Sequence, residues 1–168
     1  MPASSAIAPG TLYLHYAGKE AIYGELLSLS LADLQKSLRA AYQAAADPAP
    51  RLLAVSDAFY RFYRERPDAL HLGLYLAQGL KPAGLTPELD RQLNGRLIQC
   101  FAVLSDAIRA IRPLAPEELR RETVDLVAGI AGTLLLETTG RLRMLGDAGE
   151  AVLARQVERL AKRLRAAP

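Results

Sequence analysis

Apolar residues recur every three or four positions along most of this chain, which is the spacing of helices with one buried face. The longest such run, from Lys19 to Ala46, predicts one continuous helix. Its apolar positions are Ile22, Leu26, Leu27, Leu31, Leu34, Leu38, Tyr42 and Ala45. At ~1.5 Å per residue this helix spans roughly 40 Å, enough to connect two parts of a protein. Pro48 and Pro50 follow, and we expect them to end it because proline cannot continue a helix.

A second helix is expected from about Pro50 to the residues before Pro67, with aromatic residues on its apolar side. The next stretch, 68–79, permits two interpretations. Its leucines alternate with other residues as in a half-buried strand, but they also cover most sides of a helix. We predict a buried helix, because a lone strand in a helical chain would leave its backbone groups unpaired.

Three more helices complete the pattern. Thr86 and the proline after it form a helix start, with threonine as the cap, and this helix is expected to run to Pro113. The following helix, from Pro116 to about Leu145, is apolar on all sides in its middle, which indicates burial on two sides. The last helix, 149–165, is amphipathic.

These last two helices are what a subunit needs to build a four-helix interface with a second copy about a two-fold axis. The sequence therefore predicts a homodimer. The predicted interface residues are Leu126, Ile130, Leu134, Leu153, Val157 and Leu160.

The composition narrows the class of protein. Of the 168 residues, 51% are hydrophobic and 23% are charged, which is ordinary for a folded globular chain and, with the helical spacing, predicts an all-α fold. The net charge of +3 permits contact with nucleic acid without requiring it. A single cysteine, Cys100, suits a reducing compartment. The sequence shows no signal peptide and no apolar run long enough to cross a membrane, so we expect a cytoplasmic protein.

A motif near the N-terminus is the most specific local feature of the sequence. After Pro9 it reads Gly10-Thr11-Leu12-Tyr13, then His15-Tyr16, then Lys19-Glu20. This order closely resembles the end of the DNA-binding domain in TetR-type (TetR/AcrR-like) transcriptional regulators. In that family the segment spans the recognition helix of a helix-turn-helix and the first turn of the long helix that follows. The resemblance therefore implies a recognition helix at about residues 8–16.

The same resemblance implies a role for each residue of the motif. The residues that would lie near DNA phosphates are Thr11, Tyr13, His15, Tyr16 and Lys19, and those that would approach base edges are Pro9 and Gly10. This division is chemically sensible, because hydroxyl and ammonium groups position a protein on the DNA backbone whereas base edges carry the sequence. The implied partner is double-stranded operator DNA.

The family places two helices before this motif, and residues 1–7 are too few to form them. We therefore expect residues 1–27 to be the remnant of a truncated helix-turn-helix head and residues 28–168 to be a regulatory and dimerisation domain. A lone helix of about nine residues is marginal in water. This polypeptide as written is thus expected to bind operator DNA poorly.

The resemblance further implies ligand-controlled repression, in which an effector in the helical body shifts the long connecting helix. Pockets between helices are mostly apolar with a few polar groups, so we expect a small apolar effector. The candidate pocket residues are Phe59, Phe62, Tyr63, His71, Tyr75, Gln78 and Phe101.

The sequence offers little support for catalysis. It has two histidines, no His/Cys/carboxylate cluster with metal-ligand spacing, and no glycine-rich phosphate loop or nucleophile motif. We therefore predict no enzyme activity, no metal and no cofactor. Cys100 is interpreted as a small buried apolar residue. The alternative to a DNA-binding regulator is a dimeric helical module that senses a ligand or binds a protein without DNA.

Overall fold

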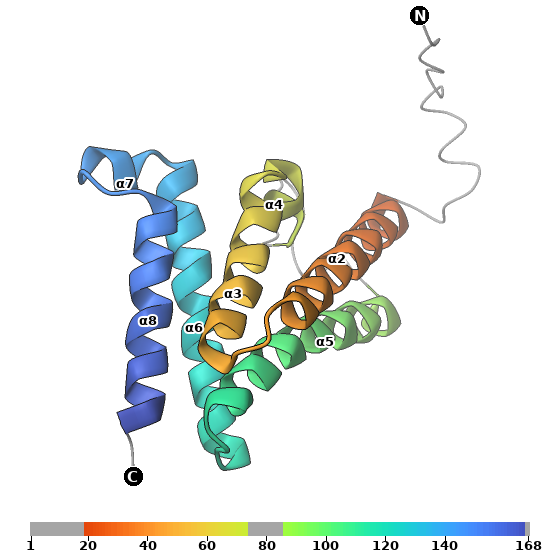
Figure 1. The fold of residues 1–168 in the computed structure, drawn as a ribbon. Coiled ribbons are helices and arrows are strands. Elements are labelled where there is room, and N and C mark those ends of the chain that lie inside the picture. The colour runs from red at the N-terminus through yellow and green to blue at the C-terminus, as the bar shows by residue number, and fades with distance from the viewer. Residues whose placement is uncertain (1–18, 74–85, 167–168) are drawn as a thin grey trace, which may run out of the picture.

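The computed structural model describes residues 19–73 and 86–166, and every regular element in these ranges is an α-helix (Figure 1). The helices are α2 (Lys19–Ala44), α3 (Pro48–Arg64), α4 (Pro67–Gly73), α5 (Pro87–Ile111), α6 (Pro116–Thr138), α7 (Arg141–Met144) and α8 (Gly149–Ala166). The all-α prediction is confirmed for these ranges. The strand alternative for 68–79 is wrong as far as Gly73, and residues 74–79 lie outside the described part.

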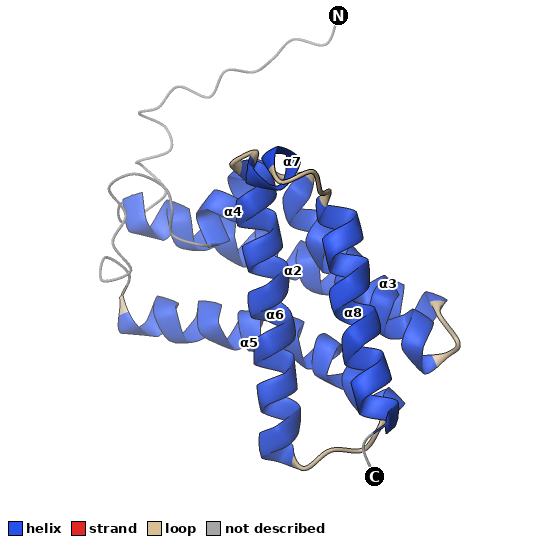
Figure 2. Cartoon of the chain, turned by 90° about the vertical axis from the view of Figure 1, so that its left-hand side faces the viewer, coloured by secondary structure: helices blue, strands red, loops and turns tan. Residues whose placement is uncertain are grey.

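Helix α3 lies between two groups of helices. On one side it packs against α2 and α5, and on the other side against α6 and α8. Helices α6 and α8 run antiparallel beside each other, joined through the short α7, as both views show (Figures 1 and 2). Helix α5 also contacts α6, so the two groups share one core.

The helix starts follow from local chemistry. Proline occupies the first turn of α3, α5 and α6, where its missing N–H breaks no helical hydrogen bond. Thr86 caps α5, and its hydroxyl accepts the Leu89 N–H at 3.3 Å, as predicted. Arg51 supplies hydrogen bonds to backbone carbonyl groups just after α2. Its Nε donates to the Ala45 carbonyl oxygen at 2.9 Å, and its Nη2 donates to the Ala46 carbonyl oxygen at 2.7 Å.

Helix α6 is shorter than the sequence pattern predicts. It ends at Thr138 rather than near Leu145, because Gly140 adopts a left-handed conformation with φ of 71°. The Gly140 N–H donates to the Glu137 carbonyl oxygen at 2.8 Å, which closes the helix end. The chain then turns through α7 and returns as α8.

The core stripe of α2 is narrower than predicted. Leu27, Leu31, Leu34 and Leu38 are buried, whereas Leu26 is 54% exposed. Leu26 lies one position off the stripe, and this rotates it about 100° away from the core. No helix in the described part of the chain is long and apolar enough to span a membrane.

Candidate functional site

The predicted DNA-contacting residues from Pro9 to Tyr16 lie outside the described residues. Lys19 is the first residue of α2, but its side chain is also outside the described part. Their assignment to DNA therefore stays a prediction.

Four of the predicted pocket residues form one aromatic cluster between α3 and α5. The ring centroids of Phe59 and Tyr63 are 5.2 Å apart, those of Phe62 and Tyr63 are 5.2 Å apart, and Phe101 on α5 lies 6.3 Å from Phe59. The three residues of α3 are 5–7% exposed. Burial raises the pKa of the Tyr63 hydroxyl, so the cluster holds no charge at neutral pH.

Of the other predicted pocket residues, only His71 lies in the described part of the chain. His71 on α4 is exposed, and Tyr75 and Gln78 lie outside the described residues. Phe62 also borders a surface groove of about 700 Å³ between α2 and α3. The Arg66 guanidinium covers this ring at 4.4 Å from its centroid, which is the geometry of a cation–π contact.

The six predicted dimer residues of α6 and α8 lie in the core of the chain itself. Their exposed fractions range from 0% to 6%, and the residues are Leu126, Ile130, Leu134, Leu153, Val157 and Leu160. They fasten the two helices to each other and to α3. A surface between two copies would therefore have to use the opposite side of these helices.

That opposite side of α6 carries a second apolar stripe. Val124, Ala128, Ala131 and Leu135 are spaced by four, three and four positions, which places them on one face. Val124 is 53% exposed and Leu135 is 48% exposed. A Cβ atom added to Gly132 would meet nothing within 4 Å. We call Val124, Ala128, Ala131 and Leu135 the outer stripe. The sequence already contained its spacing, but the inner stripe matched the helical period equally well.

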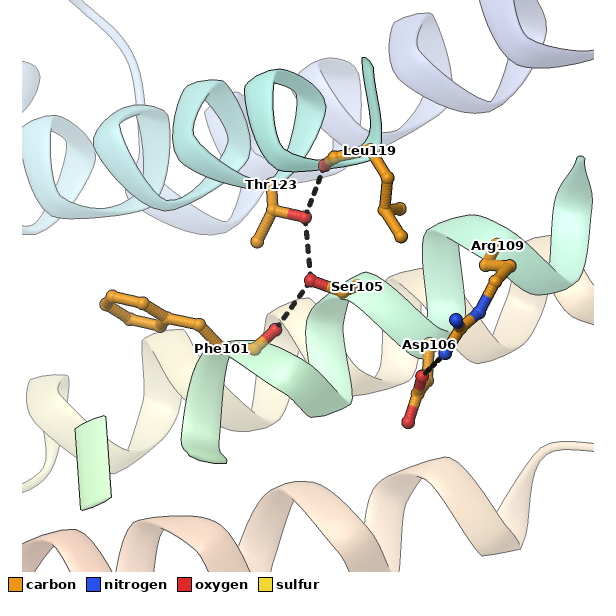
Figure 3. Close-up of polar contacts among 6 residues, drawn as sticks. All are labelled: Phe101, Ser105, Asp106, Arg109, Leu119 and Thr123. Carbon is orange, nitrogen blue, oxygen red and sulfur yellow. Dashed lines mark hydrogen bonds and ion pairs between the residues drawn. The ribbon is translucent and has the colours of Figure 1, made fainter. Parts of the chain in front are cut away.

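A polar link joins α5 to α6 next to the aromatic cluster (Figure 3). The hydroxyl oxygens of Ser105 and Thr123 are 2.9 Å apart. The Ser105 hydroxyl also lies 3.1 Å from the Phe101 carbonyl oxygen on α5, and the Thr123 hydroxyl lies 2.8 Å from the Leu119 carbonyl oxygen on α6. Each hydroxyl carries one proton, so one of the two donates across the helix pair while the other donates to its own helix. The two hydroxyls thereby connect α5 to α6 by one hydrogen bond.

The described residues contain no group of three or more His, Cys, Asp or Glu side chains that could hold a metal. Cys100 is buried, as predicted, and its Sγ lies 3.4 Å from the Leu31 carbonyl oxygen. Burial raises the pKa of this thiol to about 11, so it is protonated and unreactive at neutral pH.

Several solved structures share this fold, among them the following two. One is a protein of unknown function from Rhodococcus sp. RHA1, with a TM-score of 0.72 and 17% identity, over 95% of this chain and 80% of that chain. The other is a bacterial regulatory protein in the tetR family from Rhodococcus RHA1, with a TM-score of 0.73 and 16% identity, over 96% of this chain and 82% of that chain. No protein-family model matches the sequence, and no curated protein matches it. The predicted TetR-like fold is confirmed.

Proposed function

We propose that this protein is a TetR-like transcriptional regulator, a ligand-responsive repressor that acts on operator DNA in the cytoplasm as a homodimer. The observation that carries the proposal is the likeness in fold, over 96% of the chain, to a regulatory protein in the tetR family. The motif from Gly10 to Lys19 supports it independently, because its residue types resemble the DNA-contacting end of that family's head. The role is binding and regulation, without catalysis.

The outer stripe supports the homodimer. An apolar stripe that faces away from its own core needs a partner surface, and two-fold symmetry lets one stripe pack against its own copy. The small side chains of Ala128 and Ala131, together with Gly132, allow two helices to approach closely there. We place Ala128 and Ala131 at the centre of this contact and Val124 and Leu135 at its two ends.

The aromatic cluster supports an apolar effector. Phe59, Phe62, Tyr63 and Phe101 supply large apolar faces, and the Tyr63 hydroxyl supplies one polar group. Phe62 borders the surface groove, so a ligand in the groove would have to displace the Arg66 guanidinium to reach the rings. A planar aromatic or alicyclic compound is the chemical class that fits such a lining.

The proposed DNA contacts are the motif residues from Pro9 to Lys19. The sequence-based expectation that the 168-residue polypeptide itself binds operator DNA weakly stays a prediction. A gel-shift titration of this polypeptide against symmetrical sites tests it, and a specific complex at nanomolar protein would overturn it.

The experiment for the function as a whole combines DNA selection with measurement of mass. This chain, extended at its N-terminus by the two head helices that the resemblance implies, is mixed with genomic fragments at physiological salt, and the bound fragments are sequenced, because salt separates specific from nonspecific binding. We expect enrichment of a two-fold symmetric site that is occupied by two chains. A dimer that enriches no sequence would favour the DNA-independent module instead.

A further inference from the structure

A buried polar contact joins α3 to α6 at the start of α8. The Tyr60 hydroxyl donates a hydrogen bond to the Glu137 carboxylate, although these residues are 77 positions apart in the sequence. The Tyr60 side chain is fully buried. It is a polar contact between residues distant in the sequence, and it lies beside apolar core residues of α6 and α8.

Gly149, the first residue of α8, packs closely against the Tyr60–Glu137 pair. A Cβ atom on Gly149 would overlap the Tyr60 hydroxyl and would lie 2.7 Å from the Glu137 Oε2 atom. Only glycine lets the backbone come this close. The carboxylate also lies at a helix N-terminus, where the helix dipole favours negative charge. Three helices therefore meet at one hydrogen bond.

Arg64 extends the contact by one helical turn. Its guanidinium lies 5.6 Å from the centroid of the Tyr60 ring and pairs with Glu150 in the first turn of α8. These charged groups are 39% and 57% exposed, so the pair contributes little energy by itself. It nevertheless adds a second connection between α3 and α8.

Much of the remaining contact among these helices is apolar packing, beside a hydrogen bond of 3.4 Å that the Gln156 Nε2 group donates to the Thr133 hydroxyl oxygen. Ile130, Leu134, Leu153 and Val157 are apolar core residues of α6 and α8, and ridge-into-groove packing of such residues permits several neighbouring arrangements of similar energy. A hydrogen bond has one geometry, and its loss would leave a buried polar group unpaired. Buried polar contacts of this kind can fix register where apolar packing does not.

Helix α3 carries the predicted effector residues on its other side. Phe59 belongs to the aromatic cluster, whereas Tyr60, the next residue, points to Glu137. We propose that Tyr60 is a positioning residue that locks α3 to the α6–α8 pair, so that a shift of α3 caused by an effector moves the outer stripe relative to α2. This inference rests on the proposed function, because it concerns how that regulator would couple its ligand to its dimer surface.

The test measures the position of α8 relative to α2 within one chain. Spin labels are attached at Arg39→Cys on α2 and Lys162→Cys on α8, both exposed sites, in a Cys100→Ala background. Labelled chains are mixed with an excess of unlabelled chains, so that only distances within a chain are recorded. Pulsed electron resonance then gives the α2–α8 distance distribution.

Tyr60→Phe removes only the hydroxyl. We expect it to broaden the distribution or to shift it by roughly 1–2 Å, the scale of helix shifts in switching proteins. Ser56→Ala is the matched control, because Ser56 is fully buried one turn away on α3 and its hydroxyl has no partner among the described residues. Glu137→Gln keeps an acceptor oxygen for Tyr60. Both are expected to retain the wild-type distribution.

A wild-type distribution for Tyr60→Phe, with only a loss of stability, would overturn the proposal. If Tyr60→Phe does not fold, Glu137→Ala removes the acceptor instead and must give the broadened distribution. The readout is an intrachain distance, so it remains valid even if sedimentation shows a monomer. Failure of the dimer proposal and failure of the positioning proposal are therefore distinguishable.

Discussion

Leu135→Glu should separate the dimer into monomers without unfolding either one. Leu135 faces away from the core and is 48% exposed in the single chain. Substitutions at such exposed positions usually change folding stability by within about 0.5 kcal/mol. In a two-fold contact, however, each copy contributes one Leu135, so a single substitution is present twice.

The size of the effect follows from the exposed area. Complete burial of a leucine side chain contributes about 1.5–3 kcal/mol, and roughly half of this side chain remains to be buried by a partner. The loss is therefore about 1 kcal/mol per copy and about 2 kcal/mol per dimer, which corresponds to roughly 30-fold in the dissociation constant. Two carboxylates brought into an apolar contact cost several kcal/mol more. We expect a weakening of at least 30-fold.

Sedimentation velocity over a concentration series measures the dissociation constant, and urea denaturation of the monomeric variant measures folding. Ile130→Ala is the matched control on the inner side of the same helix. Ile130 is fully buried, so this change should cost roughly 2–5 kcal/mol of folding free energy. An unchanged dissociation constant for Leu135→Glu would refute the reasoning, as would a wild-type protein that stays monomeric at every concentration.

Three further predictions concern stability, measured by urea denaturation. Arg51→Ala should lower the free energy of unfolding by about 1–3 kcal/mol, because it removes two charge-assisted hydrogen bonds to carbonyl oxygens after α2. Ser56→Ala should be neutral or stabilising by up to about 1 kcal/mol, because it deletes a buried hydroxyl that has no partner in 19–73 or 86–166. Burial, and then the bond to Glu137, raises the pKa of Tyr60 from 10.0 to about 12. The raised pKa stabilises the fold below pH 10, and this contribution is lost between pH 10 and 12, so wild type should lose about 2 kcal/mol more than Tyr60→Phe over that range.

One specific result would contradict each of these three stability predictions. An arginine variant as stable as wild type would mean that the helix end is satisfied by solvent. A destabilised serine variant would reveal a partner for the hydroxyl. Equal losses for wild type and Tyr60→Phe above pH 10 would show that the tyrosine proton is not held by the fold.

The helix boundaries were predictable where the chain carries strong local signals. Thr86 with its following proline marked the start of α5, and Pro113 marked its end, because caps and prolines act within one turn. The end of α6 was missed because the apolar pattern continues into Leu142, which is buried although it belongs to α7. Gly140 reverses the backbone there, and a hydrophobic period carries no information about a change in direction.

The candidate site was predictable only in part, because periodicity identifies a face but not its neighbour. Helix α6 has two apolar stripes, and the one containing Ile130 was assigned to the dimer although it packs against its own chain. The aromatic residues of α3 and α5 did come together, since both lie on core-facing stripes. The bond between Tyr60 and Glu137 carried no signal in a single sequence, because only tertiary packing brings these residues together.

The most direct test of the proposed function selects genomic DNA with this chain extended at its N-terminus by the two head helices that the resemblance implies. We predict that the extended chain binds one two-fold symmetric site at nanomolar concentration as two chains, and that Leu135→Glu in the extended chain loses this binding in proportion to its weakened dimer. Equal recovery of all genomic fragments by the extended dimer at physiological salt would contradict the assignment as a DNA-binding regulator.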